Sequence, residues 1–131
     1  MRERQTVRLL VVDERDRVLL FKIEFAGVHE PSVEPGQAAR VFWITPGGGI
    51  EAGEDDRMAA RRELWEETGF LVADLGPCVW EQDHPLVVDG ELLRMRERYY
   101  LIRLASQEIA LGHQTELERA TYRAHRWWSA D

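Results

Sequence analysis

Two glutamates, Glu66 and Glu67, follow Glu63 at three and four residues near the middle of the 131-residue chain. Residues at these spacings share one face of a helix, so we expect the three carboxylates to crowd into one small volume. Like charges that lie so close together repel one another unless protons or a cation relieve the repulsion. Hard divalent cations such as Mg²⁺ bind carboxylate oxygens together with water and substrate phosphates. The spacing therefore predicts a binding site for Mg²⁺, with Mn²⁺ as the other suitable ion.

Three glycines, Gly47, Gly48 and Gly49, precede the glutamates and follow a short apolar stretch. Glycine lets the backbone approach a ligand closely and adopt positive φ angles. The carbonyl groups of such a segment can bind a metal, and its N–H groups can face phosphate oxygens. Taken alone, the glycines also fit a tight turn, and the glutamates also fit a solvated acidic helix. Their succession favours one site for a metal and a phosphorylated substrate.

The segment of residues 48–70 resembles the signature of the Nudix hydrolases, G-x5-E-x7-R-E-U-x-E-E-x-G-U, in which U is a bulky apolar residue. All nine specified positions match with every spacing intact, so the motif is far more specific than a glycine-rich fingerprint alone. The resemblance implies an α+β fold, an α/β/α sandwich around a mixed β-sheet, in a single domain of residues 1–131. The matching residues are Gly48, Glu54, Arg62, Glu63, Leu64, Glu66, Glu67, Gly69 and Phe70.

The resemblance also implies roles for the residues of this motif. Arg62 resembles the arginine that orients the glutamates by ion pairing, and Glu54 resembles the family's supporting acid. The glycines correspond to the loop that contacts the metal and the diphosphate. The residues that the resemblance implies as metal ligands are Glu63, Glu66, Glu67 and, through its carbonyl, Gly48.

The implied reaction is the metal-dependent hydrolysis of a nucleoside diphosphate linked to another group. The expected partner is therefore a nucleotide-type small molecule. A carboxylate serves as the general base in such a reaction, either from the motif or from another part of the chain. Outside the motif, Glu116 and Glu118 are the first candidates because they follow an expected loop, and Glu97 is the next.

Residues outside the motif select the substrate, and they leave nucleoside triphosphates, ADP-ribose and nucleotide sugars open. Pro85 lies 15 residues after Phe70, close to where ADP-ribose-hydrolysing members of the family often carry a proline. This position favours an ADP-ribose-like substrate, although a proline here also suits the end of a strand. Trp43, which lies shortly before the glycines, and Trp80 are the candidates for stacking on a nucleobase, with a place in the core as the alternative.

Two other functions fit the same fold. A non-catalytic nucleotide sensor is the first, but such proteins typically lose glutamates of the motif, and all of them are present here. A diphosphate isomerase is the second, and it needs a catalytic cysteine in the right place. The only cysteine, Cys78, lies in an apolar stretch. The intact motif therefore favours the hydrolase.

The acidic charge of the chain is concentrated around the motif. The net charge is −7, from 24 acidic and 17 basic residues, and residues 47–70 contribute seven of the acids but only three of the bases. A surface with this bias repels polyanions, so we do not expect nucleic acid as a partner. No apolar run approaches the roughly 20 residues of a membrane-spanning helix, and no signal peptide is recognisable. With its single cysteine, the protein is expected in the reducing cytoplasm, without a membrane partner.

Hydrophobic patterns and turn residues predict the secondary structure. Helices are expected at residues 55–68, between a run of acids and Gly69, and at residues 115–125. A hairpin turn is expected at Asp89–Gly90. The chain ends where similar proteins continue into another helix, so either a segment is missing or a homodimer completes the core. Strands are expected at residues 6–13, 17–25, 41–45, 70–75, 78–83 and 97–104, and residues 126–129 fit a last strand or a packing segment.

Overall fold

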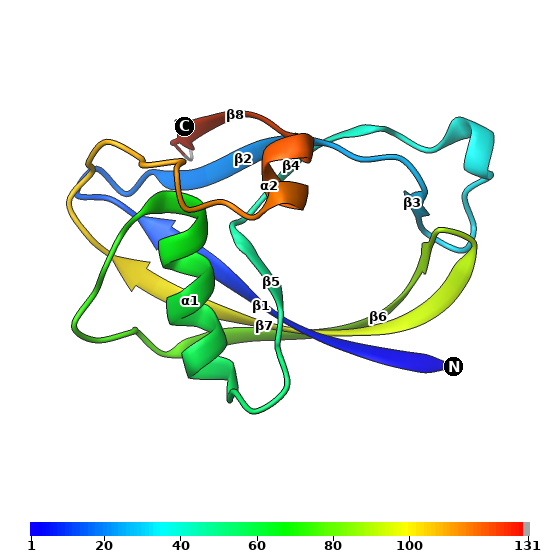
Figure 1. Cartoon of the computed structure of the whole chain (residues 1–131), viewed down its shortest axis with the longest axis horizontal. Coiled ribbons are helices and arrows are strands. Elements are labelled where there is room, and N and C mark those ends of the chain that lie inside the picture. Colours follow the sequence, from blue (N-terminus) through cyan, green and yellow to red (C-terminus); the bar gives the residue numbers. More distant parts are fainter. Residues whose placement is uncertain (130–131) are drawn as a thin grey trace.

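The computed structural model describes residues 1–129, two residues fewer than the predicted domain. Strands predominate, with two α-helices and one short 3-10 helix between them (Figure 1). None of the helices formed by these residues has the length and apolar character that crossing a membrane requires. In chain order the elements are β1 (Arg2–Val12), β2 (Val18–Glu24), β3 (Val28–His29), η1 (Pro35–Gln37), β4 (Val41–Ile44), β5 (Gly47–Gly49), α1 (Asp56–Thr68), β6 (Cys78–Val88), β7 (Glu91–Arg103), α2 (Glu116–Thr121) and β8 (Tyr122–Trp128).

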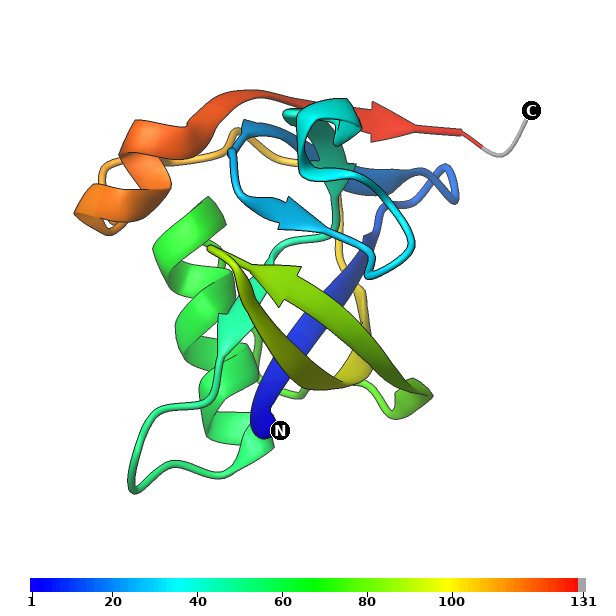
Figure 2. The ribbon, with the colours of Figure 1, turned by 90° about the vertical axis from the view of Figure 1, so that its right-hand side faces the viewer.

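The strands form one mixed sheet. Its main path runs β3-β6-β7-β1-β2-β4, while β5 pairs with β1 and β8 pairs with β2. β1 and β7 are parallel, in register from Arg2 opposite Leu93 to Val12 opposite Arg103, and the other pairs are antiparallel. The sheet is strongly curled, with β2, β4 and β8 above β1, β7 and β6 in both views (Figure 1, Figure 2). This mixed sheet with its helices confirms the predicted α+β class.

The core lies between α1 and the face of the sheet that this helix covers. Val7, Leu9 and Val11 alternate along β1 and are fully buried, as expected where one face of a strand is covered. Ala60 and Leu64, one turn apart on α1, belong to the same core. Burial of a valine or leucine side chain is worth roughly 1.5–3 kcal/mol. These contacts therefore fix α1 against β1 and hold the face of α1 that carries the glutamates in place.

Helix α1 begins and ends as the sequence predicts. Asp55 is its N-cap, and the Asp55 side chain accepts a hydrogen bond from the Met58 N–H at 2.8 Å. Gly69 ends the helix with a φ of 75°, a left-handed conformation that glycine adopts without steric cost, and its N–H donates to the Trp65 carbonyl. The hairpin turn at Asp89–Gly90 is also confirmed, since both residues have positive φ and join β6 to β7.

The strand predicted at residues 70–75 is wrong, because this segment is an irregular connection. Two arginines of α1 donate hydrogen bonds to carbonyl groups of this segment. Arg57 donates to the Leu75 carbonyl at 3.0 Å. Arg61 donates to the Val72 carbonyl at 2.7 Å. The connection therefore remains bound to the helix without joining the sheet.

The second helix is shorter than predicted, because α2 ends at Thr121 and the chain continues as β8. Tyr122 and Trp127 pack against the core from β8, which pairs with β2 over most of its length. This nonlocal pairing outweighs the helical pattern of the local sequence. The glycines 47–49 likewise form a strand against β1 instead of a simple turn. Strands β6 and β7 are longer than predicted because they pair with each other along their length.

Candidate active site

Helix α1 and strand β5 bring the predicted residues together. Glu63 and Glu67 lie one turn apart on α1 and are only 5% and 8% exposed. β5 pairs with β1 so that Gly48 lies opposite Val7, beneath the helix. A Cβ atom at Gly48 would collide with the Glu63 carboxylate, and the Gly47 N–H donates to Glu67 Oε2 at 2.7 Å. Glycine is required at Gly47, because its φ is 147° and a Cβ atom there would collide with the Val7 carbonyl oxygen.

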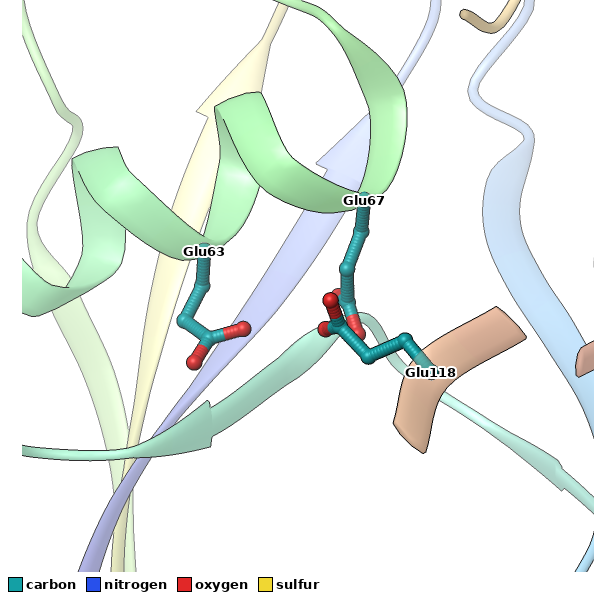
Figure 3. Close-up of side chains that lie close together, drawn as sticks. All are labelled: Glu63, Glu67 and Glu118. Atoms are coloured by element: carbon teal, nitrogen blue, oxygen red, sulfur yellow. The ribbon is translucent and has the colours of Figure 1, made fainter. Parts of the chain in front are cut away.

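A third carboxylate reaches this pair from a distant part of the chain. One oxygen each of Glu63, Glu67 and Glu118 lie within 4.8 Å of one another, and we name this group the three-carboxylate site (Figure 3). A capping box begins α2 and orients Glu118. The Thr115 hydroxyl accepts from the Glu118 N–H at 3.2 Å, and the Glu118 carboxylate accepts from the Thr115 N–H at 2.8 Å. Of the two bases placed first by the sequence, Glu118 thus lies at the site, whereas Glu116 is exposed and outside this group.

The three-carboxylate site is short of positive charge. Burial raises the pKa of Glu63 to about 7, with Arg62 opposing this shift and Glu118 adding to it. Burial and the neighbouring Glu63 raise the pKa of Glu67 well above its ordinary value. Glu63 Oε2 is buried and has no hydrogen-bond partner within residues 1–129. A divalent cation would supply the missing positive charge and bind this oxygen, so the donor set fits a hard metal ion.

Arg62 orients the glutamates around it. Its guanidinium donates to Glu54 Oε1 at 2.6 Å and to the Gly49 carbonyl at 2.9 Å. The same guanidinium donates to Glu63 at 2.9 Å and to Glu66 at 3.2 Å. The hydrogen bond from Arg62 lowers the pKa of Glu54, whereas burial raises that of Glu66 in spite of Arg62. One arginine thus fixes two of the predicted metal ligands but leaves the site with an excess of negative charge.

A cleft of about 710 Å³ lies next to the three-carboxylate site. Its lining combines the glutamates, Arg62 and the glycine strand with an apolar surface that suits a nucleobase or another flat group. Arg8 of β1 also lines the cleft, although no motif in the sequence pointed to it. Only the register of β1 with β5 and β7 brings Arg8 there. The apolar lining includes Phe21, Ile23, Phe25 and Ile44.

Three other residues considered from the sequence lie away from the three-carboxylate site. Trp43 is 39% exposed, does not line the cleft and packs edge-on against Trp128, with ring centroids 5.1 Å apart. Pro85 is exposed on β6 and also lies outside the cleft lining. Glu97 is buried on β7 among partners of its own. Base stacking by Trp43 and substrate selection by Pro85 therefore stay predictions without structural support.

The chain matches the family model for the NUDIX domain over residues 2–131. An RNA pyrophosphohydrolase of Nitrobacter winogradskyi is 30% identical over 135 residues, which cover 95% of this chain and 74% of that protein. Nudix hydrolase 25 of Arabidopsis thaliana is 39% identical over 77 residues, which cover 50% of this chain and 44% of that protein. The match to the family model therefore extends over nearly the whole chain, while the match to the plant protein covers half of it.

Solved structures share the fold. A MutT NUDIX hydrolase from Burkholderia pseudomallei superposes with a TM-score of 0.66 at 24% identity, covering 98% of this chain and 84% of that one. The NUDIX domain of Shewanella oneidensis NrtR, complexed with ADP ribose, gives a TM-score of 0.61 at 17% identity, covering 98% and 73%. Since the family model spans residues 2–131 and the intact motif lies at the cleft, the chain belongs to the Nudix family of hydrolases.

Proposed function

We propose that the protein is a metal-dependent pyrophosphohydrolase that cleaves a nucleoside diphosphate linked to another group. The observation that carries this proposal is the three-carboxylate site, where Glu63, Glu67 and Glu118 meet beside a cleft of nucleotide size. A divalent cation relieves the repulsion among these groups, so we expect Mg²⁺ or Mn²⁺ to bind there. When bound, such an ion polarises phosphoryl oxygens and lowers the pKa of a bound water.

Some side chains of this site bind the ion, and others orient the side chains that bind it. Glu63 and Glu67 face the cleft from α1, and Arg62 fixes the orientation of Glu63 and Glu66. The Gly47 N–H holds Glu67 by one oxygen, which leaves the other available to the ion. Because β5 carries no side chains, phosphate oxygens can approach its backbone closely. Glu66 and the Gly48 carbonyl remain predicted ligands in this scheme.

We assign to Glu118 the role of a metal ligand, because its carboxylate lies with those of Glu63 and Glu67. The general base is the other role that the sequence suggests, and Glu118→Gln distinguishes the two. A ligand role predicts that Mg²⁺ affinity and turnover both fall. A base role predicts that turnover falls while Mg²⁺ affinity is kept. Glu116→Gln on the same helix is the matched control, and we expect it to keep both because Glu116 is exposed.

We further propose a small nucleotide, and not an RNA end, as the substrate, although the Nitrobacter relative is named an RNA pyrophosphohydrolase. The exposed arginines of β7 already have acidic partners. Arg94 donates to Asp83 at 2.9 Å, and Arg98 donates to Asp56 at 2.8 Å. Arginines that are paired in this way offer little attraction to a polyanion, whose binding depends on free positive charge. Among small nucleotides, ADP-ribose is the first to test, since the position of Pro85 favours it.

The test is a hydrolysis assay with Mg²⁺ or Mn²⁺ on nucleoside triphosphates, ADP-ribose, nucleotide sugars and an RNA with a 5′-triphosphate. We expect the wild-type protein to turn over one of the small classes and Glu67→Gln to lose this activity. Glu108→Gln, a change at an exposed glutamate outside the cleft, is the matched control and keeps it. Faster hydrolysis of the RNA than of every small nucleotide contradicts the proposed substrate class. Nucleotide binding without any turnover supports the sensor instead.

Two further properties follow as proposals from the sequence. The single cysteine, Cys78, is exposed and unpaired by any disulfide, which suits a protein of the reducing cytoplasm. A homodimer is one of the alternatives that the sequence leaves open, and light scattering of the purified protein tests it directly. A mass of about 15.2 kDa by this method would contradict the dimer.

A further inference from the structure

A second buried carboxylate, Glu97, lies on the side of the sheet that faces away from α1. Val7 of β1 is buried in the core beneath α1. Thr6 and Arg8 flank Val7 on the same strand, so their side chains point to the opposite face. The parallel register of β1 and β7 places Thr6 beside Glu97 on this face. The two sides of β1 thus carry two separate acidic groups.

Glu97 has hydrogen-bond partners on both of its oxygens. Thr6 Oγ1 and Arg8 Nε each donate to Glu97 Oε2 at 3.0 Å. His84 Nε2 lies 2.8 Å from Glu97 Oε1. Burial would raise the pKa of Glu97, but the hydrogen bond from His84 and the charge of Arg8 outweigh it and lower the pKa. An ionised carboxylate with this set of partners is suited to hold a cation in place.

Arg8 is held through Nε and Nη1, which leaves Nη2 of its guanidinium available to a ligand. Nε donates to Glu97, and Nη1 donates to the Thr45 carbonyl at 3.3 Å. Nη2 makes no hydrogen bond with any part of the chain that the structure describes, residues 1–129. The aliphatic part of Arg8 lies along β5, where a Cβ atom at Gly47 would come 3.1 Å from Arg8 Cδ. The side chain is 20% exposed and lines the same cleft as the three-carboxylate site.

Arg8 and Arg62 approach the cleft from opposite sides of β5. Arg62 lies on the α1 side, where its guanidinium donates hydrogen bonds to Glu54, Glu63 and neighbouring groups. Arg8 lies on the other side, opposite Gly47 in the register of β1 with β5, and lines the same cleft as the three-carboxylate site. A diphosphate bound beside β5 would therefore find the metal on one side and a guanidinium on the other. Guanidinium groups suit phosphate oxygens because their N–H groups form paired, charge-assisted hydrogen bonds.

We propose that Arg8 binds a phosphate group of the substrate from the side of β5 opposite the metal, and that Glu97 positions Arg8 for this contact. This inference rests on the function proposed above, and it adds a phosphate-binding residue outside the Nudix motif. It predicts that Arg8 contributes to the binding of the phosphate groups themselves and not to the binding of the metal.

The test measures the binding of inorganic pyrophosphate in the presence of Mg²⁺ by titration calorimetry. Pyrophosphate lacks a nucleoside, so it reports on phosphate contacts alone. We expect Arg8→Gln to weaken its binding about 10- to 100-fold, the usual worth of a hydrogen bond to a charged group, while the affinity for Mg²⁺ alone is unchanged. Arg94→Gln, the same change at an arginine outside the cleft, is the matched control and should bind pyrophosphate as the wild-type protein does.

The positioning role of Glu97 is tested by a double-mutant cycle. Glu97→Gln is expected to weaken pyrophosphate binding less than Arg8→Gln does, and to leave Mg²⁺ binding unchanged. The double variant is expected to bind no more weakly than Arg8→Gln alone, because Glu97 acts through Arg8. If Glu97→Gln weakens binding by the same factor with and without Arg8, Glu97 has a purely structural role and the positioning is refuted.

The remaining outcomes separate this inference from the proposed function. Wild-type binding of Mg²⁺, combined with equal pyrophosphate affinity in Arg8→Gln, overturns the role of Arg8 and leaves the hydrolase intact. Binding of Mg²⁺ without any detectable pyrophosphate binding also counts against Arg8. A wild-type protein that binds neither overturns both proposals. If Arg8→Gln does not fold, Arg8→Lys serves instead, since one ammonium cannot hold Glu97 and keep the guanidinium's second contact.

Discussion

Glu63 and Glu97 are buried to nearly the same degree on opposite sides of strand β1, yet their surroundings differ completely. Glu63 is 5% exposed and Glu97 is 8% exposed. Glu63 has a buried oxygen without a hydrogen-bond partner within residues 1–129, and burial raises its pKa to about 7. Glu97 receives hydrogen bonds on both oxygens, and its pKa is lowered although burial opposes this. The pKa of the same kind of side chain is thus shifted in opposite directions within one small protein.

The difference shows that the arrangement of partners, and not burial alone, decides what a carboxylate can do. Burial destabilises the charged form of both groups, and only nearby donors or cations can compensate for it. Glu97 has such partners in Arg8, Thr6 and His84. Around Glu63, residues 1–129 supply one hydrogen-bond donor, Arg62, and place Glu118 close by. The uncompensated side is suited to bind an added metal ion, and the compensated side is suited to fix an arginine.

Removal of the charge at Glu63 should have the largest effect. We expect Glu63→Gln to lower kcat at least about 100-fold, because changes even to groups that merely support a metal ligand commonly cost 10- to 100-fold. The same variant should be more stable than the wild-type protein above pH 7 without metal, since it no longer carries a charge in an unfavourable place. Steady-state kinetics and denaturant unfolding in EDTA measure the two effects. Lower stability of the variant in EDTA would contradict this account of the site.

Local sequence patterns were enough to predict the glutamates of α1 on the metal side of β1, where one oxygen of Glu63 lacks a compensating partner in the described part of the chain. The spacing of Glu63, Glu66 and Glu67 and the caps of α1 all lie within one short segment, so their geometry follows from the period of a helix. Glu118 is one of three candidate bases outside the motif, and only the position of α2 separates it from Glu116, which the sequence ranks equally. A helical pattern could not show where α2 ends, because β8 depends on its pairing with β2.

The compensated side could not be predicted in the same way. Arg8 and Glu97 are 89 residues apart in the sequence, and their contact depends on the register of β1 with β7. A shift of that register by one residue would turn Thr6 and Arg8 to the other face. Each residue taken alone fits an ordinary exposed strand position. Their pairing is therefore a property of the sheet, and no local pattern in the chain contains it.

The next largest effect is the pH dependence of stability. The folded pKa of Glu63 is about 7 and its ordinary value is 4.5, so folding takes up a proton between these values. The stability contributed by protonated Glu63 is complete below pH 4.5 and is lost as the pH rises through 7. The loss is on the order of 3 kcal/mol for a shift of this size. Denaturant unfolding in EDTA from pH 5 to pH 8 measures it, and saturating Mg²⁺ should abolish the decline.

Glu97 contributes with the opposite sign. Its folded pKa lies below its ordinary value, so its contribution is present above pH 4.5 and is lost as the pH falls through the folded pKa. As the pH falls below 4.5, Glu97 therefore loses its contribution while that of Glu63 no longer changes, and the window from pH 5 to pH 8 reports on the metal side. A decline that is the same with and without Mg²⁺ would show that groups outside the three-carboxylate site cause it.

Removal of the charge at Glu97 should have a smaller effect, and we expect it to lower the free energy of unfolding. We expect Glu97→Gln to lower the free energy of unfolding by about 2 kcal/mol, because Arg8 loses its charged partner while buried against β5. The pair Arg8→Gln with Glu97→Gln should restore part of this loss, since no unpaired charge remains. Urea unfolding of the three variants measures both steps. An increase in stability in Glu97→Gln would mean that Glu97, like Glu63, lies in an uncompensated site.

The smallest effect is expected for an exposed carboxylate with a good partner. Asp83 accepts two hydrogen bonds from Arg94, and both side chains are about half exposed, at 46% and 47%. The hydrogen bond from Arg94 lowers the pKa of Asp83, just as the partners of Glu97 lower its pKa. If this hydrogen bond is removed, however, water can replace it, because both side chains are exposed. We expect Asp83→Asn to leave the unfolding midpoint and pyrophosphate binding within experimental error of wild type. A destabilisation as large as that of Glu97→Gln would show that the partner alone, and not the combination of partner and burial, sets the energy of these carboxylates.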